Sequence, residues 1–322
     1  MTGKQAHAGK HEVTPSSVDK VMYPEDDITK GDVLAYYSDV AEVMVPHLRD
    51  RPLTMRRFPD GIGKSGFFQQ EAQDYFPDWI QTADVPRRQG EGTVRHVLVQ
   101  DADTLVYLAN QACLEFHTWL ARADKLDCPD LMVIDLDPPE GTGLNRLRQD
   151  ARLVTDVYTE LGLTTFLQAT GGRGFHLTTP LTGDADSDTV RELARGIARL
   201  LAAESPTLLT TEQRKSARGD RVFLDTNRNA YGQTAVAPYS LRARPGAPAA
   251  TPITIDELSR VEPNRYGLRN ESRRLARKKD PWADIHQHAG SAEDALARLA
   301  ELGRSGNHSD ARPAKPTGSG KD

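Results

Sequence analysis

Cysteine is scarce in this sequence, and long apolar stretches are missing from it. The two cysteines, Cys113 and Cys128, have neither CxxC spacing nor partner histidines. Neither a disulfide framework nor a zinc site is therefore expected, and both thiols are predicted to be reduced. Apolar runs such as residues 131–134 are far shorter than the roughly 18 to 20 residues that a membrane span needs. We expect no membrane-spanning segment.

A secretory signal is also missing. The first residues, MTGKQAHAGKHEV, contain no apolar h-region and no small-residue cleavage site, so a cytoplasmic location is expected. Glycine and proline together account for 45 of 322 residues, since the counts are 25 and 20, which excludes a low-complexity chain. The length allows about two domains or one large unit, at roughly 150 residues per domain.

Excess charge of one sign is absent overall but present locally. The net charge is −5, so the whole chain does not indicate a polyanionic partner. Basic residues are nevertheless concentrated in residues 49–57, 214–221 and 265–279. Such clusters can neutralise phosphates even in an acidic chain, although a solvated helix face accounts for any one of them equally well.

The pattern of apolar residues predicts one ordered domain over residues 14–303, with disordered ends at 1–13 and 304–322. Helices are expected over residues 29–48, 104–121, 145–161, 187–204 and 291–302. Strands are expected over residues 52–58, 66–70, 94–100, 131–134, 164–168, 175–179 and 222–224. Because strands and helices do not alternate strictly, the order favours an α+β fold over a Rossmann fold.

The sequence VIDLDPP at residues 133–139 is the sharpest local feature. In a strand, residues i and i+2 face the same side, so Asp135 and Asp137 would present two carboxylates about 7 Å apart at their Cα atoms. Hard oxygen ligands suit magnesium or manganese, whereas zinc prefers histidine or cysteine. The alternative is that the pattern merely ends a strand and caps a turn.

A glycine-rich turn, TGGRGFH, follows at residues 170–176. Glycines let the backbone approach an anion closely, and Thr170, Arg173 and His176 can add donors to phosphate oxygens. The turn is not a Walker loop, because no GKS or GKT follows, and a tight hairpin is the alternative interpretation. A third acid, Asp225, ends the strand VFLD. Together, three strand-borne acids and a basic glycine turn are what metal-assisted nucleotidyl transfer requires.

The order of these motifs resembles the polymerase domain of bacterial ligase D, a member of the archaeo-eukaryotic primase superfamily. The resemblance rests on DLDPP, TGGRGFH, VFLD and APYSLRARPGAPAATPI, together with VDKVMYP, TKGD, GFFQ, LEFHTW and DPW. It extends over about residues 13 to 300. It implies a primase-like catalytic core of two packed mixed β-sheets flanked by helices, in a DNA-directed polymerase that often prefers ribonucleotides and uses manganese.

The resemblance also implies roles for individual residues. Asp135, Asp137 and Asp225 match the acids of a two-metal site for Mn²⁺ or Mg²⁺. The nucleotide-binding positions match Thr170, Gly171, Gly172, Arg173, His176, His117, Arg218 and Arg242. Lys20 and Lys30 match a pair that holds a DNA 5′-phosphate. Phe67 and Phe68 match aromatics that stack on template bases, and the alternative for them is two core side chains.

The implied function is addition of NTPs or dNTPs at primer 3′ ends of gapped or broken DNA, in end joining or gap filling. Possible partners are a separate DNA ligase and a Ku-type end-binding protein, with the enzyme in the cytoplasm at the nucleoid. The ligase motif KxDG is missing, the nearest stretch being KLDC at residues 125–128, so a stand-alone polymerase or an excised domain is expected. A primase that starts strands de novo and an inactive DNA-end-binding module are the alternatives.

Two positions depart from the family pattern. Thr170 stands where the family turn usually begins with serine, and this change keeps the hydroxyl. Arg228 stands where a glutamine commonly contacts the triphosphate. We therefore expect the nucleotide pocket to differ in detail from that of the family.

Overall fold

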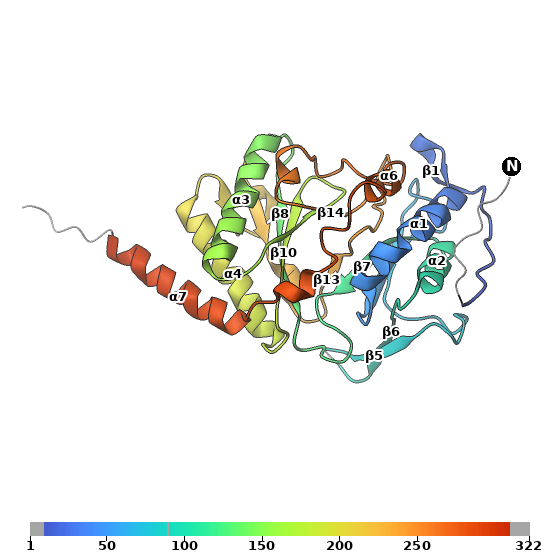
Figure 1. Ribbon diagram of the computed structural model, residues 1–322, viewed down its shortest axis with the longest axis horizontal. Helices are drawn as coiled ribbons and strands as arrows, with labels where there is room; N and C mark the ends of the chain where they lie inside the picture. The colour runs from blue at the N-terminus through green and yellow to red at the C-terminus, as the bar shows by residue number, and fades with distance from the viewer. Residues whose placement is uncertain (1–9, 89, 310–322) are drawn as a thin grey trace, which may run out of the picture.

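Two β-sheets lie between two outer layers of helices in the computed structural model, which describes residues 10–88 and 90–309 (Figure 1). One layer contains α3 and α4 on a six-stranded sheet, and the other contains α1 and α2 on a four-stranded sheet. Each half has its own large apolar core. The predicted α+β class is confirmed.

The six-stranded sheet is mixed, because β11 and β12 are parallel and the other neighbours are antiparallel. Its strands, in spatial order, are β11 (Leu209–Thr210), β12 (Val222–Asp225), β8 (Leu131–Asp137), β10 (Phe175–Pro180), β9 (Phe166–Ala169) and β14 (Thr251–Ile253). The chemistry-bearing motifs DLDPP, TGGRGFH and VFLD therefore lie on three adjacent strands.

The four-stranded sheet is antiparallel throughout, which corrects the prediction of two mixed sheets. Its strands are β13 (Thr234–Val236), β7 (Cys113–Trp119), β3 (Leu53–Arg57) and β4 (Phe67–Gln69). Two-stranded sheets are formed by β1 (Val21–Tyr23) with β2 (Ile28–Thr29) and by β5 (Thr82–Pro86) with β6 (Thr93–Val97). Parallel pairing requires a long crossover, and within this sheet only β3 and β4 are joined by a short connection of the kind that favours antiparallel neighbours.

The α-helices are α1 (Lys30–Leu48), α2 (Ala102–Asn110), α3 (Leu144–Glu160), α4 (Ser187–Glu204), α5 (Lys215–Arg218), α6 (Glu271–Leu275) and α7 (Ala292–Ser309). Short 3₁₀ turns are η1 (Pro24–Asp26), η2 (Asn227–Asn229), η3 (Glu257–Ser259) and η4 (Ile285–His288). Among residues 10–88 and 90–309, no helix is long and apolar enough to cross a membrane.

Helix α1 begins where the sequence predicts. The Thr29 hydroxyl accepts a hydrogen bond from the Asp32 N–H, and the Asp32 carboxylate accepts one from the Thr29 N–H, which completes a capping box. The helix continues through Pro46 to Leu48. Its first turn contains Lys30, so the cap fixes the backbone next to one of the predicted phosphate-binding lysines.

The predicted helix over residues 104–121 is wrong in its second half. Helix α2 ends at Asn110, Ala112 has a φ of 60°, and Phe116 lies in β7. The spacing of Leu105, Leu108, Ala112 and Phe116 fits a helix. However, β7 is buried on both faces, and in such a short segment the pattern of apolar residues cannot distinguish a strand from a helix. The left-handed residue at 112 ends the helix and starts a central strand.

The predicted ends of the ordered domain also need correction. Helix α7 begins after Ser291, whose hydroxyl accepts from the Asp294 N–H, but it continues past residue 303 to Ser309. A glycine inside a helix costs about 1 kcal/mol relative to alanine and does not by itself end it. At the other end, the His11 N–H donates to Asp103 and the His11 ring stacks on Trp79. The predicted disorder of residues 1–9 and 310–322 falls outside the described residues.

Candidate active site

Three polar side chains form a row across adjacent strands of the six-stranded sheet. Asp135 on β8 lies opposite Asp225 on β12 and opposite His176 on β10. Directly opposed residues of antiparallel strands point to the same face. The His176 Nε2 lies 3.5 Å from Asp135 Oδ2. The sheet register thus brings together two of the three predicted metal ligands and one predicted nucleotide ligand.

Asp135 is ionised in this environment. Burial alone would raise the pKa of its carboxyl, but the charge and hydrogen bond of His176, with smaller contributions from Arg228 and Arg242, lower that pKa below its ordinary value. The carboxylate is therefore available as an anionic oxygen ligand throughout the neutral pH range.

Asp137 faces the same side as Asp135, two residues further along β8. Arg218 Nη1 donates to Asp137 Oδ2 at 3.0 Å, and Arg173 Nη2 lies 3.8 Å from Oδ1. Arg218 belongs to α5 and also packs over the Phe223 ring at 3.7 Å. Arg218 thus reaches the candidate site through Asp137, although it does not line the cavity of about 300 Å³ that opens beside these acids.

The donor chemistry of the three carboxylates suits a hard divalent cation. Three carboxylates on one sheet face are oxygen ligands, which fit magnesium or manganese and not zinc. In the described part of the chain, however, no three His, Cys, Asp or Glu side chains already stand as a compact metal-binding group. Asp225 Oδ1 accepts from the Asn227 N–H at 2.9 Å, and Asp137 is paired with arginine. The donors fit such a cation, but their side chains are held by other partners.

A cavity of about 300 Å³ opens between the two sheets beside these acids. Its basic lining residues are Arg56, Arg173, Arg228, Arg242, Arg244, His117 and His176, and its acids are Glu115, Asp135 and Asp137. Five arginines around a polar cavity suit a ligand with several negative charges. Arg228, which departs from the family pattern, is among the lining residues and adds positive charge.

The glycine turn lies on the wall of this cavity. Gly171 has a φ of 66°, and a Cβ there would lie 2.7 Å from Arg242 Cγ. The Gly171 N–H donates to the Pro263 carbonyl, and the Gly172 N–H donates to the Thr170 hydroxyl. These two amides are therefore used within the protein, so the arginines and His176 offer more free donors to a phosphate than the predicted amide cradle.

Glu115 is a central residue of the site that the sequence did not single out. It is buried on β7, and its Oε1 accepts from Arg56 Nη1 at 3.1 Å and from the Ala243 N–H at 2.8 Å. Arg242 Nε lies 3.6 Å away, and His117 Nε2 contacts Oε2 at 3.0 Å. Glu115 thereby holds three cationic or ionisable cavity residues. The sequence feature that could have indicated this role is the spacing of two residues between Glu115 and His117, which places both side chains on one face of a strand.

The two ionisable partners Glu115 and His117 differ in charge. Burial alone would raise the pKa of Glu115, but its bonds to His117 and the Ala243 amide and the nearby Arg242 charge lower that pKa to about 2. Burial is the largest effect on His117 and lowers its pKa despite the opposing effect of Glu115. At pH 7 the carboxylate is therefore charged and the imidazole is neutral and donates to it.

The predicted stacking pair is exposed, as a base-stacking role requires, but it is divided between two faces. Phe67 is 47% exposed and Phe68 is 62% exposed. Successive residues of a strand point to opposite sides. Phe68 lines the cavity, where its ring contacts His117 edge-on, whereas Phe67 lies near the Arg57 guanidinium. The alternative of two core phenylalanines is wrong.

The two predicted 5′-phosphate lysines are neighbours. The Lys30 N–H donates to the Lys20 carbonyl, and Lys30 Nζ donates to the Ser16 carbonyl and hydroxyl. Burial and the charge of Lys20 lower the pKa of Lys30. Lys20 Nζ lies 3.3 Å from Asp60 Oδ1 and is exposed. Lys30 is only 6% exposed and is thus not an ordinary surface lysine.

Comparisons with known proteins place this geometry in a family. Residues 29–282 match the family model described as LigD, primase-polymerase domain. The chain is 34% identical over 303 residues to the multifunctional non-homologous end joining DNA repair protein LigD of Mycobacterium tuberculosis, covering 92% of the chain and 40% of that protein. It is 32% identical over 289 residues to LigD of Pseudomonas aeruginosa, covering 88% of the chain and 34% of that protein.

A comparison with solved structures leads to the same family. The polymerase domain of Mycobacterium tuberculosis ligase D in complex with DNA superposes with a TM-score of 0.80 at 34% identity, covering 87% of this chain and 99% of that domain. The chain thus spans about 40% of the first of these relatives but matches nearly the whole of its polymerase domain. The chain belongs to the family of LigD primase-polymerase domains, which are metal-dependent nucleotidyltransferases of the primase-polymerase type.

Proposed function

We propose that this protein adds nucleotides to the 3′ ends of gapped or broken DNA and so fills gaps during end joining. The observation that carries the proposal is the row Asp225–Asp135–His176 across three strands, beside a cavity lined by five arginines. Carboxylates next to a strongly cationic cavity are the two parts that transfer from a nucleoside triphosphate requires. The proposed functional unit is the domain of residues 14–303.

The proposed metal ligands are Asp135, Asp137 and Asp225. Bound Mn²⁺ or Mg²⁺ would supply charge neutralisation at the reacting phosphate and at the departing pyrophosphate. His176 holds the Asp135 carboxylate in place from the neighbouring strand. Arg218 holds Asp137 in the same way from α5. We infer that nucleotide entry draws Arg173 from Asp137 toward the triphosphate, because Arg173 is 3.8 Å from the carboxylate and half exposed.

The proposed nucleotide site is the cavity itself. Arg173, Arg228 and Arg242 bind the triphosphate, and the Thr170 turn with Gly171 and Gly172 shapes its wall. Arg242 Nη1 donates to the Thr170 carbonyl at 2.8 Å, so this arginine ties the turn to the cavity. His117 and the exposed ring of Phe68 lie on the opposite wall and offer a surface for a base.

Primer extension tests the proposed activity. We expect the protein to extend a primer across a gap in the presence of Mn²⁺ or Mg²⁺, with NTPs used in preference to dNTPs. Chelation of the cation is expected to stop the reaction. Synthesis without a primer would instead support a primase, and a protein that binds DNA ends but incorporates nothing under any of these conditions would contradict the proposal.

Lys20 and Lys30 are proposed to recognise the 5′-phosphate on the far side of the gap. Two ammonium groups that converge on a phosphate dianion gain more electrostatic binding free energy than they would gain beside an uncharged 5′-hydroxyl. We expect wild type to bind a 5′-phosphorylated gap about tenfold more tightly than an unphosphorylated one, equal to about 1.4 kcal/mol. Lys20→Ala is expected to abolish most of that preference in a fluorescence anisotropy titration.

Lys64→Ala is the control for this measurement, since Lys64 is also exposed and its segment contacts the Lys20 segment through the hydrogen bond from the Ile62 N–H to the Met22 carbonyl. The control should keep the full preference for the phosphate. Lys20 is the better target than Lys30, because Lys30 Nζ anchors Ser16 and its loss would disturb the N-terminal segment. Indifference of the wild-type protein to the 5′-phosphate would refute the assignment.

The cellular setting follows from the same proposal. A protein that fills gaps leaves a nick, so we infer that it works with a DNA ligase and a Ku-type end-binding protein, in the cytoplasm at the nucleoid. What supports this is that the relatives are non-homologous end joining proteins and that the structural relative was solved with DNA.

A further inference from the structure

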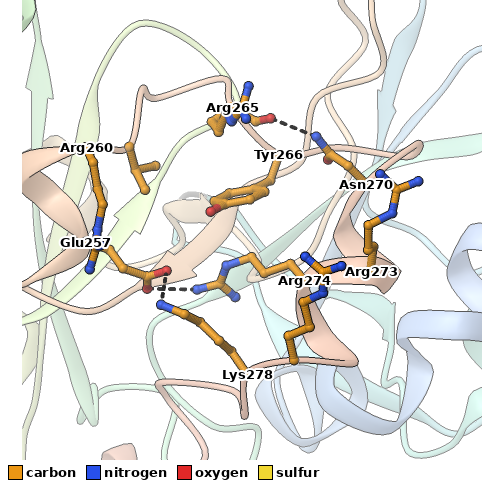
Figure 2. Close-up of a pocket in the computed structure, with 10 residues that line it drawn as sticks. Glu257, Arg260, Arg265, Tyr266, Asn270, Arg273, Arg274 and Lys278 are labelled. Carbon is orange, nitrogen blue, oxygen red and sulfur yellow. Dashed lines mark hydrogen bonds and ion pairs between the residues drawn. The ribbon is translucent and has the colours of Figure 1, made fainter.

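A second cationic cavity, of about 520 Å³, lies within residues 257–278 and shares no lining residue with the candidate active site (Figure 2). Its cationic lining residues are Arg260, Arg265, Arg273, Arg274, Arg277 and Lys278. We call these six residues the C-terminal arginine pocket. One carboxylate, Glu257, is among the residues that line it.

Most of these cations are not needed to hold the fold together. Lys278 and Arg274 contact Glu257 at 2.8 and 3.0 Å. In the described part of the chain, no hydrogen bond or ion pair engages the guanidinium groups of Arg260, Arg265, Arg273 and Arg277. Four free guanidinium groups around one concavity repel one another, and a bound anion would relieve that repulsion.

The floor of the pocket adds an independent observation. Arg274 is 6% exposed; its buried Nε has no hydrogen-bond partner, and its buried Nη1 makes no hydrogen bond, since the nearest carboxylate oxygen, Glu271 Oε1, lies 3.8 Å away. Its guanidinium lies over the Tyr266 ring at 5.0 Å, and Figure 2 shows Tyr266 at the centre of the pocket. A buried donor without an acceptor costs about 1 to 3 kcal/mol. An acceptor-rich ligand in the pocket would remove that cost.

We propose that the C-terminal arginine pocket binds phosphate groups. Phosphate oxygens accept several charge-assisted hydrogen bonds at once, which matches a pocket with many donors and a single acid. The chain segment that carries the pocket also contacts the glycine turn, since Pro263, between the lining residues Val261 and Arg265, accepts the hydrogen bond from the Gly171 N–H. The phosphates belong either to a nucleic-acid strand that extends beyond the active site or to a free polyphosphate. This binding does not depend on the proposed polymerase activity.

The test compares two double variants of equal charge. Arg273→Ser/Arg277→Ser removes two exposed, unpaired pocket cations. The control, Arg152→Ser/Arg195→Ser, removes two exposed arginines from the outer helices α3 and α4. Both proteins are expected to melt at the wild-type temperature. Binding is measured with a fluorescent single-stranded oligodeoxynucleotide, over a salt series, and with inorganic triphosphate by calorimetry.

We expect the pocket variant to bind the oligonucleotide about tenfold more weakly than the control, with a salt slope smaller by about 1.4, because each lost contact with a single strand contributes about 0.7. If only the oligonucleotide binds the pocket variant more weakly than the control, the phosphates come from nucleic acid. Loss of one class of triphosphate sites would instead identify a free polyphosphate. Equal binding of both probes by the pocket variant and the control would overturn the proposal.

Discussion

Asp137→Asn is expected to lower nucleotide incorporation about a thousandfold, equal to about 4 kcal/mol of transition-state stabilisation. The substitution keeps the shape of the side chain but removes the anionic oxygen that a divalent cation requires. DNA binding should stay within about twofold of wild type, because the change makes the site more positive and leaves the phosphate contacts in place. Single-turnover primer extension and an anisotropy titration on the same gapped DNA measure the two effects.

The fold is expected to tolerate this substitution. Arg218 loses the negative charge of Asp137 but still donates to the Glu212 and Gln213 carbonyls, so α5 remains anchored. The control is Asp156→Asn, which removes an exposed carboxylate from α3 and should leave incorporation unchanged. Incorporation by Asp137→Asn within tenfold of wild type would show that Asp137 is not a metal ligand.

The acids of this site could be predicted from the sequence because their signal is local. Asp135 and Asp137 share a face through the two-residue period of a strand, and Asp225 ends another strand. What the pattern could not give was the strand register, which sets Asp135 between Asp225 and His176. Register depends on pairing between segments that are distant in sequence. The row became visible only in the folded sheet.

Other parts of the site depend on tertiary contacts. Glu115 lies in a segment for which the apolar spacing predicts a helix, and its role arises from Arg56 and Arg242, which are 59 and 127 positions away in the chain. The predicted strand over residues 66–70 already placed Phe67 and Phe68 on opposite faces, but which of the two faces the cavity depends on how β4 packs in the folded protein. Local propensity indicates where helices and strands can form, whereas burial and contacts with distant segments decide which of the two forms in the folded protein.

Glu115→Gln is expected to destabilise the protein by about 3 kcal/mol at pH 7, since a pKa shift from 4.5 to about 2 converts at about 1.4 kcal/mol per unit. The amide still accepts from the Ala243 N–H, but the charge facing Arg56 and Arg242 is lost. For a chain of this size the melting temperature should fall by about 5 to 10 °C. Thermal unfolding monitored by circular dichroism measures it.

The pH dependence gives this prediction its sharpest test. Because the pKa of Glu115 is lower in the folded state, its contribution is fully present above pH 4.5 and is lost as the pH falls from 4.5 toward 2. The difference between wild type and Glu115→Gln should therefore shrink over that window. Glu140→Gln, an exposed change, should match wild type at every pH. A difference that stays constant as the pH falls would assign the destabilisation to altered packing around Arg242 and not to the charge of Glu115.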